Sequence, residues 1–292
     1  MDVNTITKED PRYPKLLAQI GDAPKQLQYR GNWDPRLFEK CLAVVGTRKM
    51  TRYGKQVCEQ IVSEVASAGV TIVSGFMYGI DATAHQAALN ARGKTIAVMP
   101  CGIDLIHPEH QHELHGDITE AGGLILSEYE GTYPSSTWMF PRRNRIVAGL
   151  SQATLVVEAG EGSGALITAN FAKKYGRKIF AVPNPITSAV SHGVTQLLRE
   201  GAGLVSSAQD ILHYYGLRPR IPKPGLGSPK PGLGDIEGKL EKKIVEHLAQ
   251  DPMAMDDLSR ALAMPASQLG AAVSLLQLEG YITEEEGKFY VS

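Results

Sequence analysis

Short apolar runs recur along the first two thirds of the chain, and polar, helix-like segments separate most of them. The intervening segments include Gly54–Ser67 and Ala165–Tyr175. Strands rich in Val and Ile that alternate with helices are typical of a parallel sheet buried on both faces. The pattern therefore predicts an extended Rossmann-like, doubly wound, mostly parallel α/β sheet. The predicted strands are Leu42–Gly46, Thr71–Gly75, Thr95–Met99, Leu124–Glu128, Thr154–Gly160 and Ile179–Pro183.

Loops rich in small residues follow four of these strands: "GTRKMTRYG", "SGFMYGIDATAH", "MPCGIDLIHP" and "EAGEGSGALITA". In a doubly wound sheet, ligands bind beyond the carboxyl ends of the strands. Backbone N–H groups at a glycine-rich helix start bind anions without side-chain charge. Glycines can also serve only to make tight turns. Four such loops on one edge favour a phosphate-binding site.

A different pattern begins at residue 217. Residues 217–234 repeat PKPGLG, and proline and glycine at this density cannot sustain a helix or a central strand. We expect a linker there, between a sheet domain at 1–216, whose first 40 residues lead into the sheet, and a domain at 235–292. In the second domain, 239–250, 253–262 and 265–282 read as three helices and 282–292 as a hairpin. This order predicts a winged helix.

Composition and charge indicate the compartment of the protein more than its chemistry. The chain has 292 residues, a net charge of −1 and three cysteines without a C-x-x-C pair, and it shows no secretory signal or long apolar span. We therefore expect a cytoplasmic protein without a metal site. Charge is uneven: 1–216 carries +1, 217–234 carries +4 and 235–292 carries −6. Because an acidic module repels phosphate, the winged helix is expected to contact protein rather than duplex DNA.

The stretch "WMFPRRNRIVAGL" places Arg142, Arg143 and Arg145 within four positions, beside Phe140 and around Asn144. The arginines could form ion pairs with acidic residues such as Glu128, Glu130 or Glu158. Aromatic rings interleaved with arginines also suit a flexible single strand, because bases stack on rings while guanidiniums hold phosphates. A duplex reader would instead present a helix to a groove. The cluster thus favours single-stranded nucleic acid.

Five segments together resemble the DprA/Smf family, DNA-processing protein A: "VGTRKMTRYG", "SGFMYGIDATAHQAAL", "TIAVMPCGIDLIHPEH", "LSEYEGTYPSSTWMFPRRNRIVAGLSQATLVVEAGEGSGALITA" and "GRKIFAVPN". The resemblance covers most of 13–210. It implies a non-enzymatic, dimeric protein that binds single-stranded DNA without strong sequence preference and loads RecA in natural transformation. The helical N-terminal domain of many members is expected to be absent.

The resemblance also implies individual roles. Arg48 of the G-[ST]-R motif is expected to contact DNA, Phe140 to stack on a base, Arg143 and Arg145 to hold the backbone, and Asn144 to shape the loop. The small-residue loops are expected to line the phosphate track. The expected DNA-binding set is Gly46, Thr47, Arg48, Gly75, Phe76, Phe140, Arg142, Arg143, Asn144, Arg145, Ser163 and Gly164.

Two enzymatic or cofactor-dependent alternatives fit less well. Residues 160–165 match G-x-G-x-x-A, but no acidic residue follows where a dinucleotide ribose would need one, so no cofactor is expected. The fold also resembles nucleoside-monophosphate phosphoribohydrolases, whose motif carries a catalytic Glu where this chain has Thr168. Without that carboxylate the hydrolase lacks its principal group. We further expect Cys101 to be a packed residue and His85 to make a structural hydrogen bond.

Overall fold

The structure, a computed structural model, describes residues 2–218, 238–278, 281–285 and 287–291. The chain forms two compact units, Met1–Ile221 and Pro222–Ser292. The predicted linker at 217–234 lies almost entirely outside the described residues, so the linker and the exact domain boundaries stay predictions. No helix in the described ranges is long and apolar enough to cross a membrane.

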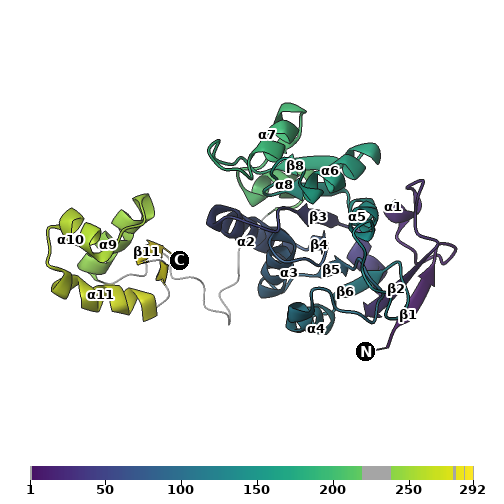
Figure 1. The fold of residues 1–292 in the computed structure, drawn as a ribbon, viewed down its shortest axis with the longest axis horizontal. Helices are drawn as coiled ribbons and strands as arrows, with labels where there is room; N and C mark the ends of the chain where they lie inside the picture. Colours follow the sequence, from purple (N-terminus) through teal and green to yellow (C-terminus); the bar gives the residue numbers. More distant parts are fainter. Residues whose placement is uncertain (1, 219–237, 279–280, 286, 292) are drawn as a thin grey trace. The chain divides into compact units, whose positions relative to one another are not determined.

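The first unit is built on one sheet, in which nine described strands are ordered β1-β2-β6-β5-β4-β3-β7-β8-β9 (Figure 1). The seven strands from β6 to β9 in this order run parallel to one another, whereas β2 pairs antiparallel with both β1 and β6. The strands are β1 (Asn4–Thr7), β2 (Gln26–Gly31), β3 (Cys41–Val45), β4 (Thr71–Ser74), β5 (Thr95–Val98), β6 (Leu124–Ser127), β7 (Ala153–Val156), β8 (Lys178–Ala181) and β9 (Gly203–Leu204).

Helices cover both faces because successive residues of the central strands point to opposite sides. In β3, Leu42 and Val44 pack in the cluster formed by α2, α3 and α8, while Ala43 and Val45 pack in the cluster of α1, α5, α6 and α7. α4 packs on Ala97, on the first of these faces. The helices are α1 (Lys15–Ala18), α2 (Arg52–Ser67), α3 (Ile80–Asn90), α4 (His112–Glu120), α5 (Met139–Leu150), α6 (Gly164–Lys174), α7 (His192–Arg199) and α8 (Ala208–Tyr214), with 3-10 turns η1 (Pro35–Phe38) and η2 (Glu109–Gln111).

The predicted fold class and all six predicted strands are confirmed. The predicted runs extend past the observed carboxyl ends by one to four residues, and after β5, β7 and β8 the chain continues with apolar residues. After β7, for example, Val157 and Ala159 are still fully buried. Hydrophobic patterning indicates which residues are buried, and here burial continues past the last hydrogen-bonded residue of the strand.

The second unit is the predicted winged helix. It contains α9 (Lys239–Gln250), α10 (Met255–Leu262) and α11 (Ala266–Leu278), followed by the antiparallel hairpin of β10 (Ile282–Glu285) and β11 (Lys288–Val291). It has its own hydrophobic core, which includes Ile244, Leu258, Leu276 and Phe289.

Candidate nucleic-acid interface

The strand order reverses between β3 and β7. From β3 the chain proceeds outward through β4, β5 and β6, and then returns to add β7, β8 and β9 on the other side. Loops that leave adjacent strands toward opposite sides open a crevice at their carboxyl ends. A pocket of about 300 Å³ lies there, which we call the switch-point pocket. Eight predicted residues line it: Gly46, Arg48, Gly75, Phe140, Arg143, Asn144, Ser163 and Gly164.

Arg48 and Phe140 form the accessible rim of this pocket. The Arg48 guanidinium carbon lies 5.1 Å from the centre of the Phe140 ring and 5.9 Å from that of the exposed Tyr78. Phe140 is half-buried, and its ring centre lies 5.8 Å from that of His107. A cation and an aromatic face are thus presented side by side.

Arg143 forms the buried wall of the pocket, with only 4% of the residue exposed. Its Nη1 donates to the Val98 carbonyl oxygen, while its Nε has no hydrogen-bond partner among the described residues. Burial lowers the guanidinium pKa, and the nearby Asp81 carboxylate opposes that shift. A Cβ on Gly75 would lie 2.2 Å from Arg143 Nη1, so only glycine lets the arginine reach this place. An unsatisfied buried donor is costly, which favours an anionic ligand.

Asp81 also lines the pocket, and the sequence analysis did not single it out. Burial raises the pKa of its carboxyl, and the positive charge of Arg143 works against that rise. Its place in the first turn of α3, within the predicted phosphate-binding segment "SGFMYGIDATAH", was the available signal. Asp81 provides the counter-charge that allows Arg143 to be buried.

Asn144 and Ser163 organise the opposite wall. Asn144 Nδ2 donates to the Gly164 carbonyl oxygen at 3.2 Å, which links α5 to the start of α6. The Ser163 hydroxyl accepts from the Ala165 N–H at 3.3 Å and caps α6. The positive end of the α6 dipole therefore lies at the pocket.

Four predicted residues do not line the switch-point pocket. The Phe76 ring is fully buried against α4, with its centre 6.1 Å from that of His115, so it is not accessible to DNA. Thr47 lies half-buried beside the pocket and makes mainly backbone contacts. Arg142 and Arg145 point to the other side of α5.

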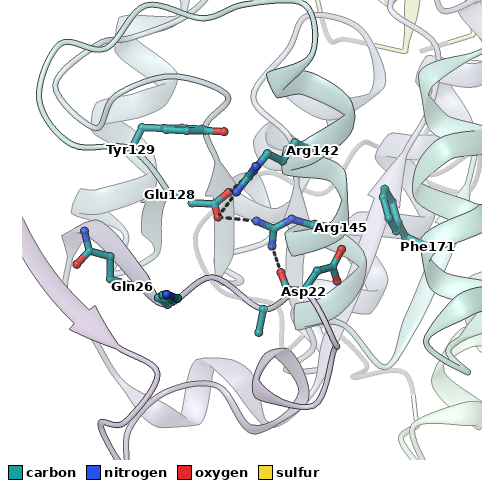
Figure 2. Close-up of a pocket in the computed structure, with 9 residues that line it drawn as sticks. Asp22, Gln26, Glu128, Tyr129, Arg142, Arg145 and Phe171 are labelled. Atoms are coloured by element: carbon teal, nitrogen blue, oxygen red, sulfur yellow. Dashed lines mark hydrogen bonds and ion pairs between the residues drawn. The ribbon is translucent and has the colours of Figure 1, made fainter.

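On that side, Glu128 accepts hydrogen bonds from both arginines (Figure 2). Arg145 is buried, with 5% exposed, and its Nη1 also donates to the Asp22 carbonyl oxygen at 2.6 Å. Its guanidinium is therefore held by the protein itself. The ion-pair interpretation therefore holds for Arg142 and Arg145. Arg143 faces the pocket, and its contact with nucleic acid stays a prediction.

Glu158 anchors the loop that carries Arg48. Its backbone carbonyl accepts from the Thr47 N–H at 2.8 Å, and its buried carboxylate accepts from the Thr51 N–H at 2.9 Å and from the Thr51 hydroxyl. Thr51 in turn caps α2 by accepting from the Gly54 N–H. A Cβ on Gly54 would lie 2.2 Å from the Glu158 carboxylate. The carboxylate thus occupies the amino-terminal end of α2.

Two residues of the phosphate loops are structural, as the sequence analysis expects. His85 is fully buried, with its ring nitrogens 2.7 Å from Thr95 Oγ1 and 2.6 Å from the Gly75 carbonyl oxygen. Cys101 is fully buried, and burial raises its thiol pKa to about 11. A thiol this protonated is a poor nucleophile.

A doubly wound sheet with an arginine-lined switch-point pocket, joined to a winged helix, defines a two-domain, Rossmann-type class. The family model of DNA recombination-mediator protein A matches residues 4–216, and that of the DprA winged helix domain matches residues 228–288. The chain belongs to this family.

Individual relatives agree with the family model. Protein Smf of Synechocystis sp. is 34% identical over 316 residues, covering 98% of this chain and 79% of the relative. DNA processing protein DprA of Streptococcus pneumoniae is 42% identical over 203 residues, covering 70% of this chain and 71% of the relative.

Two solved structures are also similar. That of S. pneumoniae DprA has a TM-score of 0.69 at 40% identity, covering 73% of this chain and 74% of that one. That of Helicobacter pylori DNA processing protein A, which concerns its single-stranded DNA binding mode, has a TM-score of 0.66 at 32% identity, covering 74% and 96%.

Proposed function

We propose that this protein binds single-stranded DNA at the switch-point pocket, as its H. pylori relative binds single-stranded DNA. The observation that carries the proposal is the pairing of Arg48 with the Phe140 ring in the pocket that the buried Arg143 also lines. An unpaired base stacks on the ring, and its phosphate meets the guanidiniums.

The shape of the site favours a single strand without sequence preference. A concave pocket of about 300 Å³ admits a splayed nucleotide but no duplex, whose bases are already stacked on one another. Stacking is tolerant of sequence because every base has a π-face.

A gel-shift comparison of single strand, duplex and AMP as competitors tests the proposal. Unlabelled single strand should displace a bound single strand, and duplex and AMP should compete weakly. Equal competition by duplex, or no binding of the single strand, would refute it.

Binding, and not hydrolysis, is proposed because Thr168 occupies the position of the hydrolase Glu. Thr168 lines the pocket and is 1% exposed. Asp81 also brings a carboxyl group to this pocket, but it lies beside the buried Arg143 as its counter-charge. Free adenine released from AMP by the protein would favour the phosphoribohydrolase instead.

We also propose that the protein acts as a dimer and delivers the bound strand to RecA during DNA uptake. Support comes from family membership, since the family is one of recombination mediators. A pull-down with the cognate RecA, with and without single-stranded DNA, tests the partnership. Absence of association in both conditions would remove it.

A further inference from the structure

A second and larger cavity, of about 790 Å³, lies on the other side of the first turns of α5. We call it the Glu128 pocket. Phe140 and Arg143 of α5 line the switch-point pocket, whereas Arg142 and Arg145 line the Glu128 pocket. One end of a single helix therefore separates the two cavities.

The Glu128 pocket contains the same kinds of groups as the first. Figure 2 shows the Tyr129 ring on one side, Phe171 on the other, and the two guanidiniums with Glu128 between them. Lys25 adds a third cation to the lining. Aromatic faces among cations are what an unpaired nucleotide requires.

Two groups in this pocket have unused binding capacity. Arg142 is half-exposed, and its bonds to Glu128 are long, at 3.2 and 3.3 Å. Since buried Arg145 already neutralises Glu128, Arg142 can turn to a phosphate without leaving that carboxylate unpaired. The Tyr129 hydroxyl is buried and has no partner among the described residues, although a hydroxyl normally has one.

Two exposed aromatic side chains lie between the amino-terminal end of α5 and Tyr129 of this pocket. Trp138, immediately before α5, is 52% exposed, and its ring centre lies 6.3 Å from that of Tyr129 and 6.0 Å from the Arg142 guanidinium. Tyr133, also 52% exposed, stacks on Tyr129 at 5.7 Å. Trp138 makes no side-chain cap, so its indole is not engaged in holding the helix start.

We propose that the Glu128 pocket is a second nucleotide-binding site, which holds an unpaired nucleotide of the same strand that enters the switch-point pocket. The strand crosses the amino-terminal end of α5, where the positive end of the helix dipole attracts phosphate. Trp138 stacks on a base at the crossing, and Arg142 holds a phosphate. This inference rests on the proposed function, because the first pocket supplies the strand.

The experiment measures affinity for oligothymidylates of increasing length by fluorescence anisotropy. The wild-type protein should gain affinity twice, once when Phe140 is covered and again when the strand reaches the Glu128 pocket. Trp138→Ala and Arg142→Gln should abolish the second gain, a loss of about tenfold for long oligonucleotides, and leave short ones unaffected. Trp138→Phe should restore it.

A control and a direct readout complete the test. Lys173→Gln removes an exposed cation of α6, outside both pockets, and should change nothing at any length. In a Trp33→Phe background, Trp138 is the single tryptophan, and long oligonucleotides should quench its fluorescence while short ones should not.

Two outcomes would overturn the inference. One is an equal loss of affinity at every oligonucleotide length for Trp138→Ala. The other is full affinity of Trp138→Ala for long strands, together with no quenching of Trp138 fluorescence by long strands in the Trp33→Phe background. Either result leaves the proposed function intact as long as Phe140→Ala weakens the binding of short oligonucleotides. If Phe140→Ala has no effect on short ones, the proposed function itself fails.

Discussion

Arg48 and Phe140 touch each other at the rim of the switch-point pocket, and the proposed function gives them different forces toward nucleic acid. In that proposal the exposed guanidinium of Arg48 replaces a counterion on the phosphate, so its contribution should depend on salt. The ring of Phe140 carries no charge, and its contribution comes from contact and desolvation. The two roles can therefore be separated by varying ionic strength.

We predict that Arg48→Ala makes the plot of log affinity against log salt shallower by roughly 0.7, the value for one single-strand phosphate. Phe140→Ala should cost about 1–3 kcal/mol of binding free energy and leave the slope unchanged. Salt titrations by anisotropy measure both, with Lys55→Ala on the exposed face of α2 as the control. A changed slope for Phe140→Ala would mean that the ring has been given the wrong role. Arg143 is unsuited to this test, because removing it also disturbs the core.

His85 should make the protein sensitive to acid. Burial lowers its pKa to about 4, from about 6.5 in the unfolded chain, so the unfolded state binds the proton more readily between these values. The associated stability is present above pH 6.5 and is lost as pH falls toward 4, by about 3 kcal/mol. Thermal unfolding across this range measures it. His85→Gln should be less stable at pH 7 but lose less on acidification; an equal acid loss in both proteins contradicts the assignment.

At the scale of elements, the loop between β3 and α2 is held in place by Glu158, which follows β7. Glu158 holds both ends of that loop, at Thr47 and Thr51. The carboxylate accepts two hydrogen bonds at the helix start, where its negative charge interacts favourably with the positive end of the helix dipole. The position of Arg48 therefore depends on a side chain more than a hundred residues away in the sequence.

We predict that Glu158→Gln lowers the free energy of unfolding by about 1–3 kcal/mol, because the amide turns a donor toward one of the Thr51 donors. DNA affinity should also fall, since the Arg48 loop loses its anchor. Denaturant unfolding and anisotropy measure the two effects. Glu161→Gln, an exposed neighbour, is the matched control. Wild-type stability and affinity in Glu158→Gln would show that the hydrogen bonds are dispensable.

The sequence predicted the elements that are buried on both faces. β1 and β2 escaped because they are rich in polar residues and have few inward side chains such as Ile6 and Leu27. β9, at the far edge of the sheet, has two residues, too few to give a pattern. Site residues were predicted where a local motif carries them. The separation of Arg143 from Arg142 and Arg145 was missed, although residues three apart share a helix face and their neighbour does not. The partners Asp81 and Asp22 were missed because tertiary packing, which no local pattern encodes, brings them to the arginines.

At the scale of the molecule, the two units have separate hydrophobic cores, and the second is acidic. We predict that protease cleaves within 217–234 and that the fragment ending at Gly216 keeps its fold and most of its affinity for single strands. Limited proteolysis, circular dichroism and anisotropy measure these properties. The isolated 235–292 fragment should not bind duplex. If the first fragment loses nearly all binding, the winged helix takes part and the charge argument fails.

The carboxylate of Glu158 has one more consequence. It sits at the start of the helix that follows β3, where a dinucleotide-binding protein of this architecture receives the pyrophosphate of its cofactor. The chain fills that position with its own anion, fixed by the fold. Under the proposed function, dinucleotides such as NAD therefore find this phosphate-binding position of the fold already occupied, and they should compete weakly with DNA.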